Sequence, residues 1–553
     1  MRKIKVLIAA VVLLLCGVCF SGTKYIDWAL GDDGNAGTSA GAGNAWKTFG
    51  EALSSADDGD IIHVAANTSY VEEGSAPNSN MYLYWNQAKS LTFIGSTDNA
   101  ADTVLTCVAG QTRILRYVYA GHNTIKFKNI SLVGVASTTS VLYLNGTDTV
   151  SCSLELDNCV VSGGTTSSIQ GETTDGQIVA DNRRLVIKNS AISGPGSGAV
   201  IRLSTAKSIS IMDSTVEQTN VASREPIMFL GQDTDYNPYQ TKDIKIINTI
   251  FKRTSTTLAD HGVLLGRGMQ FAYFDKCKIL NTSDTNTSNI ALIIKGENAI
   301  IRNSVIEGNR GLYFKGGKFG KVINNVIIGT GLYGVQLEEI DATARAIDTV
   351  DQVNNTFTHN GADRTAEFQF GMPIEVTGST GNDREYTVVG SEFTGGNTVV
   401  TVKEAIPNAV ADGNMFEHQT FEATVFENNI IDGSSSEYAV VYNNVSGFPS
   451  QIKFDYNNYQ AGSLGMFFDG TAARADLTAI KTIWAAQTDF IWTDNDENSL
   501  EVDPQLDSNY RPANTQIING GRFDINGDKT YMGAAAVMSN KGLSGIFYNG
   551  FFK

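Results

Sequence analysis

The feature that most constrains the fold is a repeat of short apolar strands around an Asn residue. The stretch 290–329, IALIIKGENAIIRNSVIEGNRGLYFKGGKFGKVINNVIIG, runs strand, glycine turn, strand, Asn and a third apolar run, and the pattern returns about 22 residues later. The turn residues of the successive units are Asn129, Asn158, Asn189, Asp213, Asn248, Lys276, Asn303, Asn325, Asn355, Asn429 and Asn457. Asn suits such a bend because it tolerates left-handed backbone, and its amide can bond the Asn of the next coil. The repeat therefore predicts an all-β solenoid of stacked coils.

One interval breaks the repeat. Asn355 and Asn429 are 74 residues apart, whereas the other spacings run from 22 to 35. The excess falls at 364–416, which has its own strand alternation and glycine-containing turns. We expect a small inserted β-module there, and its VTGST, GND and YTV segments resemble a small β-module met in phage-tail and other surface-exposed proteins. Two roles stay open for it, a ligand- or partner-binding role and that of a spacer or stabiliser.

The start of the chain predicts a targeting segment, followed by a helix that caps the solenoid. A basic start at Arg2, Lys3 and Lys5, an apolar run over 6–18 and a small-residue zone at 20–22 predict a signal peptide cleaved at about residue 21. We therefore expect a secreted or cell-surface protein, and no membrane span, since no later apolar run reaches 18 residues. Thr48 with Glu51 predicts a capped helix over the first coil. The expected divisions are 1–22, 23–363, 364–416 and 417–553.

The opening segment carries a family resemblance. Trp46-Lys47-Thr48, Gly59-Asp60 and Tyr70 match the entry segment of right-handed parallel β-helix proteins of the pectate-lyase-like superfamily, in which a loop, a short helix and a Gly-Asp turn lead into the first coil. The resemblance implies a single-stranded right-handed parallel β-helix with an N-terminal capping helix. It implies nothing about the reaction.

Charge and cysteine content remove some classes of function. The net charge of −17, from 58 acidic and 41 basic residues, disfavours nucleic acid as a partner because phosphate would be repelled. Four cysteines follow the leader, which is too few for a disulfide framework in a chain of this length, so we expect buried free thiols at Cys107, Cys152, Cys159 and Cys277. The HExxH motif, paired CxxC motifs and phosphate loops are absent from the sequence.

The strongest candidate for chemistry is a basic strip. The segments VLLGRG, LIIKGE and LYFKGG are expected to align so that Arg267, Lys295 and Lys315 occupy the same place in successive coils. Strand alternation would put these cations outside, with Tyr313 and Glu338 as neighbours that contact substrate. Such a strip suits an acidic polysaccharide, because β-elimination at a uronic acid needs a neutralised carboxylate, a base and an acid. The alternative is that the cations only solvate the surface.

This register resembles that of chondroitinase-B-like and alginate-lyase β-helix enzymes, in which a catalytic Lys and an Arg occupy successive coils. By that resemblance Lys295 matches the base, while the family's Arg position falls on Lys315 and so departs from the pattern. The resemblance implies a secreted protein that binds an extracellular, acidic polysaccharide and cleaves it as a lyase or hydrolase. The alternatives are a non-catalytic binder or adhesin, and a structural, phage-tail-like component.

A metal site is a further possibility near the N-terminus. Asp32, Asp33 and Asn35 lie on a glycine-rich loop, and their carboxylate and amide oxygens are ligands that Ca2+ accepts. A solvated turn is the other interpretation of this loop.

Overall fold

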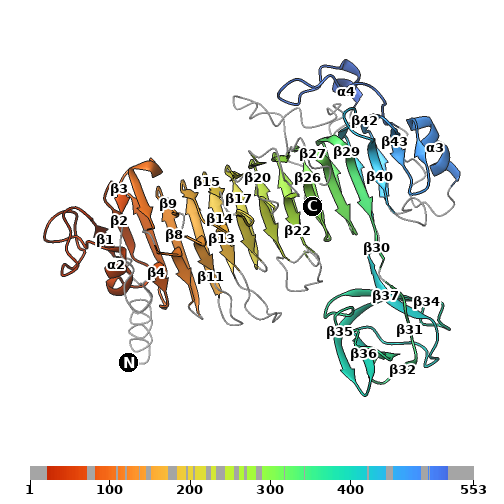
Figure 1. Ribbon diagram of the computed structural model, residues 1–553, viewed down its shortest axis with the longest axis horizontal. Coiled ribbons are helices and arrows are strands. Elements are labelled where there is room, and N and C mark those ends of the chain that lie inside the picture. Colours follow the sequence, from red (N-terminus) through yellow and green to blue (C-terminus); the bar gives the residue numbers. More distant parts are fainter. Residues whose placement is uncertain are drawn as a thin grey trace, which may run out of the picture. The chain divides into compact units, whose positions relative to one another are not determined.

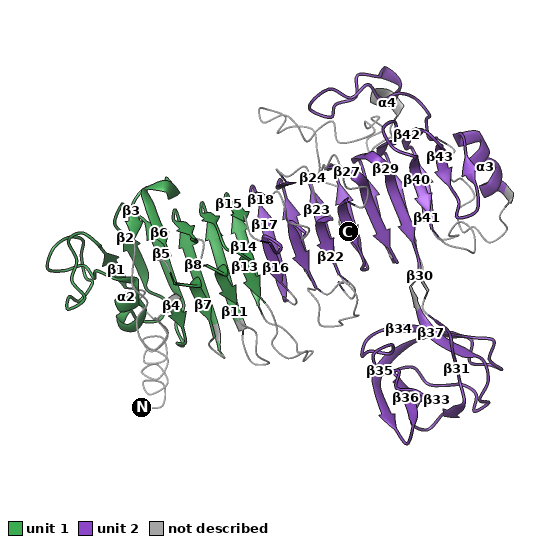
Figure 2. Cartoon of the chain, in the orientation of Figure 1, with its two compact units in different colours: residues 1–175, 181–196 green, residues 176–180, 197–553 purple. Residues whose placement is uncertain are grey.

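The protein is described by a computed structural model in which placed residues cover 22–70, 81–107, 110–118, 121–135, 138–144, 151–171, 183–194, 197–203, 206–219, 226–231, 243–253, 261–266, 269, 271–281, 289–316, 318–341, 343–419, 423–443, 452–486, 496 and 498–520. The chain forms two compact units (Figure 2), residues 1–175 with 181–196, and residues 176–180 with 197–553. Each unit is built of right-handed parallel β-helix coils, as the repeat and the family resemblance predict.

Unit 1 contributes three strands per coil (Figure 1). The first-row strands, paired in parallel, are β1 (Thr23–Ile26), β2 (Ile61–Val64), β5 (Leu91–Gly95), β8 (His122–Lys128), β11 (Ser151–Asp157) and β14 (Arg184–Lys188). The second-row strands are β3 (Asn67–Tyr70), β6 (Thr103–Thr106), β9 (Ser131–Val133), β12 (Val160–Ser162) and β15 (Ala191–Gly194). The third-row strands are β4 (Met81–Trp85), β7 (Arg113–Tyr117), β10 (Ser140–Leu144) and β13 (Ser167–Gly171). A 3-10 helix, η1 (Ala100–Asp102), precedes β6.

Unit 2 repeats this plan. Its first row is β17 (Ser208–Met212), β20 (Ile244–Ile247), β23 (Ala272–Asp275), β26 (Ala299–Arg302), β28 (Lys321–Ile323), β38 (Thr424–Glu427) and β41 (Ile452–Asp455). Its second row is β18 (Thr215–Gln218), β21 (Ile250–Arg253), β24 (Lys278–Asn281), the start of β27 (Val305–Lys315) and of β29 (Val326–Glu338), β39 (Ile430–Asp432) and β42 (Asn458–Gln460). The third row is β16 (Ile201–Leu203), β19 (Met228–Leu230), β22 (His261–Leu265), β25 (Ile290–Ile294), the ends of β27 and β29, β40 (Tyr438–Tyr442) and β43 (Gly465–Phe468). β44 (Ala473–Arg474) pairs with β43 in the antiparallel sense.

The bends between first-row and second-row strands have the left-handed backbone that the repeat predicts. The residues at these bends have φ between 47° and 57°: Asn129, Asn158, Asn189, Asp213, Asn248, Lys276, Asn303, Asn324, Asn428 and Tyr456. The first seven confirm the prediction. The last three correct it by one residue, since Asn325, Asn429 and Asn457 were expected at the bend. The error arises because two Asn residues, or Tyr and Asn, stand side by side there and the pattern alone does not say which one turns.

At the last three bends, the Asn residue that follows the bend points into the core instead of forming the turn. Asn325, Asn429 and Asn457 are fully buried, and each side chain forms hydrogen bonds with a neighbouring coil. Nδ2 of Asn325 donates to Oδ1 of Asn429 at 3.0 Å, and Nδ2 of Asn429 donates to Oδ1 of Asn457 at 2.9 Å. In unit 1, Nδ2 of Asn158 donates to Oδ1 of Asn129 at 2.9 Å. The predicted bonding of Asn amides between coils is therefore confirmed, and it satisfies polar groups inside an apolar core.

The insertion folds as an antiparallel β-module with its own core of twelve buried apolar residues. Its strands are β30 (Ile340–Asp341), β31 (Arg345–Ala346), β32 (Thr349–Asp351), β33 (Thr356–Asn360), β34 (Pro373–Thr377), β35 (Arg384–Thr394), β36 (Asn397–Val402) and β37 (Asn414–Gln419). The pairing of β30 with β37 closes its neck, so the module extends over 340–419 and the expected start at 364 is too late. Asn355 lies in the hairpin between β32 and β33 and belongs to the module rather than to a coil. The alternation over 349–360 looks like a coil strand, which explains the error.

The remaining elements close the two ends. Helix α2 (Phe49–Ser55) buries Phe49, Ala52 and Leu53 and is capped by Thr48, as predicted. Helices α3 (Leu477–Ala486) and α4 (Thr515–Gly520) belong to the C-terminal segment. The predicted signal peptide lies outside the described residues, apart from Gly22. Over the described ranges, no helix is long and apolar enough to cross a membrane. The four cysteines that follow the predicted signal peptide are buried thiols, as expected.

Candidate functional site

The outer face of the third-row strands in unit 2 is shaped by a bend in β27 and β29. A Cβ atom at Gly311 would come within 2.6 Å of the carbonyl oxygen of Gly334 and 2.8 Å of Cγ2 of Ile327, so the chain needs glycine where it turns inward. The bend shifts the strand alternation. As a result Arg310, Tyr313 and Lys315 all remain partly exposed, while Leu312 and Phe314 are fully buried.

The register of these strands corrects the predicted basic strip at one position. Ile293 pairs with Leu264 and with Tyr313, so Lys295 and Lys315 follow at the same place in successive coils, as expected. The residue in that place one coil earlier is Gly266, so the predicted alignment of Arg267 with Lys295 is wrong by one residue. Arg267 itself lies outside the described residues. In VLLGRG a glycine separates the apolar run from the cation, whereas in LIIKGE the cation follows the apolar run directly. Aligning the two cations therefore shifts the register by one residue.

The expected residues Tyr313, Lys315 and Glu338 meet in one contact. The hydroxyl of Tyr313 donates to Oε2 of Glu338 at 2.6 Å, and Nζ of Lys315 donates to Oε1 at 2.5 Å. Lys315 and Glu338 are register partners across β27 and β29, and their side chains are 22 % and 25 % exposed. The carboxylate therefore holds the ammonium group and the phenol in fixed positions at the surface.

A second group of residues lies on the same outer face, nearer the start of these third-row strand segments. Arg310, Tyr333 and Tyr438 are register partners across β27, β29 and β40. The guanidinium carbon of Arg310 is 5.4 Å from the ring centroid of Tyr333, and the rings of Tyr333 and Tyr438 are 6.5 Å apart. NH1 of Arg310 donates to Oε1 of Gln336 at 3.3 Å. We call the whole set the outer patch: Arg310, Tyr313, Lys315, Tyr333, Gln336, Glu338 and Tyr438.

The electrostatics of the outer patch are set by Arg310. Its Nε atom is buried without a hydrogen-bond partner, and in the part of the chain that the structure describes no carboxylate forms an ion pair with it. An arginine that is partly desolvated beside neutral groups retains its capacity to bind an anion. Burial raises the pKa of Tyr438, and the charge of Glu437 adds to the effect, so this phenol stays neutral at physiological pH.

Arg310, Tyr333 and Tyr438 were missed by the sequence pattern. Simple alternation from Phe314 back to Arg310 puts Arg310 inside the core, because both have even numbers. The bend at Gly311 reverses this assignment. The signal that could have found these residues is the recurrence of a small residue before the apolar strand end, Ala291, Gly311 and Gly334, at the same place in three coils.

The N-terminal loop holds the residues considered for calcium. Oδ1 of Asp33 accepts from the backbone N–H groups of Lys47 and Thr48 at 2.9 and 2.8 Å, and Oδ2 accepts from Oγ1 of Thr48 at 2.8 Å. Oδ1 of Asp32 accepts from the N–H of Gly34, and Nδ2 of Asn35 donates to the carbonyl oxygen of Ala45. The bonds of Asp33 fasten the loop to the N-terminal cap of α2. No group of three or more His, Cys, Asp and Glu side chains among the placed residues is arranged to hold a metal, and the calcium site stays a prediction.

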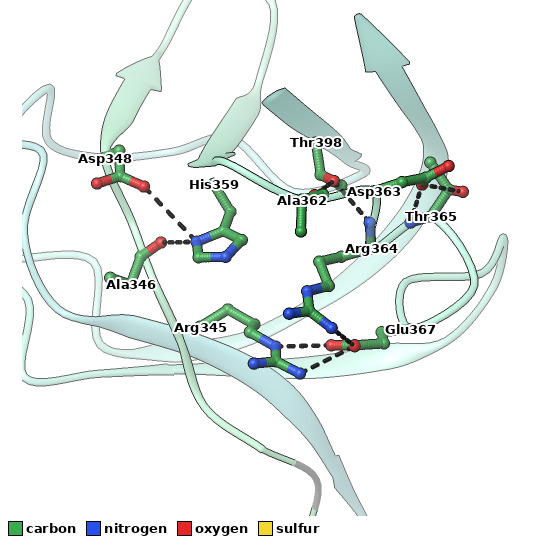
Figure 3. Close-up of polar contacts among 10 residues, drawn as sticks. All are labelled: Arg345, Ala346, Asp348, His359, Ala362, Asp363, Arg364, Thr365, Glu367 and Thr398. Carbon is green, nitrogen blue, oxygen red and sulfur yellow. Dashed lines mark hydrogen bonds and ion pairs between the residues drawn. The ribbon is translucent and has the colours of Figure 1, made fainter. Parts of the chain in front are cut away.

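The β-module contains a dense polar network (Figure 3). Glu367 accepts from Nε and NH2 of Arg345 at 2.7 and 2.9 Å and from NH1 of Arg364 at 2.9 Å. Partial burial opposes ionisation of Glu367, but these hydrogen bonds outweigh it and lower its pKa. Nδ1 of His359 lies 3.0 Å from the carbonyl oxygen of Ala346. Although Nε of Arg364 is buried without a hydrogen-bond partner among the described residues, the ion pairs of Glu367 tie β31 to the turn after β33, which indicates a structural role.

Comparisons with known proteins add little to this description. No protein-family model matches the chain, and no curated protein matches it. The fold is similar to that of the A-module of the mannuronan C-5 epimerase AlgE6 from Azotobacter vinelandii, with 12 % sequence identity and a TM-score of 0.35, over 80 % of this chain and 91 % of that module. Because a likeness at this level does not bear on function, the outer patch is interpreted from its own residues.

Proposed function

We propose that this protein is secreted and binds an acidic extracellular polysaccharide through the outer patch. The observation that carries the proposal is Arg310, a cation on an aromatic surface with no acidic partner among the described residues, in a chain of net charge −17. A guanidinium group binds a sugar carboxylate through two parallel hydrogen bonds. Flat aromatic rings such as Tyr333 and Tyr438 offer apolar area for a sugar ring while their hydroxyls remain available to water or ligand.

Cleavage of the polysaccharide is the second candidate, and the contacts limit which residues can serve it. Lys315 is an ammonium ion paired with Glu338, and Tyr313 donates its hydroxyl proton to the same carboxylate. Both are suited to neutralise a uronate or to protonate a leaving oxygen, and neither is placed to accept a proton. In a β-elimination the base removes the C5 proton while the C4–O bond breaks and the leaving oxygen is protonated. Lys295, which occupies the same place as Lys315 in the preceding coil, would then be the base.

Binding is tested by calorimetric titration of the secreted protein with oligogalacturonate, oligoalginate and chondroitin oligosaccharides, with maltotriose as the neutral control. We expect Arg310→Ala to weaken binding about 10- to 100-fold, because a hydrogen bond to a charged group contributes about 1.5–3 kcal/mol. Lys252→Ala is the matched control in unit 2, since Lys252 is a surface cation paired with Glu217 at 2.8 Å. Tyr438→Phe should retain most of the affinity and Tyr438→Ala should lose it.

Cleavage is followed in the same samples by absorbance near 230 nm, where the unsaturated product absorbs. A rise that Lys295→Ala removes supports a lyase, and retention of the oligosaccharide without product supports a non-catalytic binder or adhesin. If no acidic oligosaccharide binds, or if Arg310→Ala and Lys252→Ala behave alike, the proposal fails. A structural role in a cell-surface or phage-tail-like assembly is then the better explanation.

A further inference from the structure

Unit 1 has a row of register partners on its own third-row strands in which Tyr84 and Arg116 are partly exposed. Tyr84 of β4, Arg116 of β7, Tyr143 of β10 and Gln170 of β13 are successive register partners. The guanidinium carbon of Arg113 lies 4.2 Å from the ring centroid of Tyr143, which is a close cation–π contact. We call these five residues the unit 1 patch, on the strands coloured green in Figure 2.

The polar groups of the unit 1 patch are only partly satisfied. Tyr143 and Gln170 are 8 % and 7 % exposed, and Oε1 of Gln170 accepts a hydrogen bond from the hydroxyl of Ser140. Nε of Arg116 is buried without a hydrogen-bond partner, and over the described part of unit 1 no carboxylate forms an ion pair with this guanidinium group. Lys126, on the first-row strand β8, is by contrast paired with Glu155 at 3.4 Å.

An unpaired, partly buried cation is costly in a protein that has 58 acidic side chains available to neutralise it. Arg116 lies between Tyr84 and Tyr143 in the register, and its partial burial strengthens its attraction for an anion. The planar fork of arginine matches a carboxylate or a sulfate group, to which it donates two parallel hydrogen bonds. The partly exposed ring of Tyr84 offers apolar area for a sugar ring carrying that group.

We propose that the unit 1 patch is a second binding site, which takes a sugar residue bearing a carboxylate or a sulfate ester. The choice of an anion rests on Arg116 and its neighbours alone, whereas the choice of a sugar rests on the proposed function. In this site Arg116 holds the anionic group and Tyr84 contacts the sugar ring, while Tyr143 is buried against Arg113.

The test is the number of oligosaccharide molecules bound per chain, measured by calorimetry with the full-length mature protein. The probes are trigalacturonate, which carries carboxylates only, and a chondroitin sulfate tetrasaccharide, which also carries sulfate esters. We expect two bound molecules per wild-type chain, one for Arg116→Ala, one for Arg310→Ala and none for the double variant. Arg184→Ala removes an exposed arginine from β14 in the same unit and should leave two. Whichever probe shows the second site identifies the anion.

The outcomes separate this proposal from the proposed function. If Arg310→Ala abolishes all binding and Arg116→Ala changes nothing, the second site is refuted and the outer patch stands. The reverse pattern refutes the outer patch and leaves the unit 1 patch, and no binding of either probe refutes both. Should Arg116→Ala fail to fold, Arg116→Lys replaces it, because it retains the charge and the stem but loses the planar fork. The same loss of one bound molecule is then expected, and its absence would count against the site.

Discussion

Replacing Asn429 by Ala should strongly destabilise the coils on either side of it. Oδ1 of Asn429 accepts from N and Nδ2 of Asn325, both at 3.0 Å, and Nδ2 donates to the carbonyl oxygen of Val322 at 2.8 Å and to Oδ1 of Asn457 at 2.9 Å. Two of these partners retain another bond, since Nδ2 of Asn325 also reaches the carbonyl oxygen of Ile301 and Oδ1 of Asn457 also accepts from the N–H of Asn429. The N–H of Asn325 and the carbonyl oxygen of Val322 lose their bonds to this side chain. At about 1–3 kcal/mol for each buried group, the loss is about 2–6 kcal/mol.

Urea denaturation followed by circular dichroism gives the change in the free energy of unfolding, and hydrogen exchange of peptides covering 424–432 and 452–460 locates it. Asn429→Ser should recover part of the loss, because Ser304 occupies the same place in an earlier coil, where its Oγ accepts from the N–H of Cys277 at 3.1 Å. Asn428→Gly changes the neighbouring bend residue and should stay within about 1 kcal/mol of the wild type, since glycine also adopts its positive φ of 56°. A loss below about 1 kcal/mol in Asn429→Ala would refute the argument that interior amides hold the coils together.

Two further predictions concern ionisable groups of unit 2. Burial raises the pKa of Asp496 to about 7, against the lowering effect of hydrogen bonds from Ser499 and Tyr459, so the folded state binds a proton that the unfolded state has released. The free energy of unfolding should therefore fall by about 1.4 kcal/mol per pH unit between about pH 4 and pH 7 and level off above, and this slope should be absent from urea titrations of Asp496→Asn. Nζ of Lys318 in the coils lies 2.6 Å from Oε2 of Glu385 in the β-module, so Lys318→Glu should speed limited proteolysis at the module's neck. The charge-swapped pair Lys318→Glu with Glu385→Lys should restore the wild-type rate, and no difference between the three proteins would exclude a role for this ion pair.

The sequence was sufficient to predict the coils, but it was insufficient to predict which side chains lie on their outer face. Most bend residues could be predicted because a left-handed residue is required at the same point of each coil, and Asn adopts this backbone more readily than most residues other than glycine. The outward placement of Tyr313, Lys315 and Glu338 followed from strand alternation near the end of β27, but their contact with one another did not. Arg310 could not be assigned in this way, because the bend at Gly311 interrupts the alternation and moves the side chain to the other face. The register of Arg267 failed for a related reason, since a single residue between strand and turn changes which side chains align.

The β-module is accommodated because the stacking of unit 2 continues past it. β28 pairs with β38 although 100 residues separate their ends, and β29 pairs with β39 and β40 on the far side of the insertion. The neck begins at Ile340, two residues after Glu338, so the insertion starts where the outer patch ends along β29. The ion pair of Lys318 and Glu385 adds a second connection between coil and module. An insertion at this point leaves the interior amide bonds of Asn325 and Asn429 intact, and a ligand that extends along β29 beyond Glu338 would meet the neck of the module next.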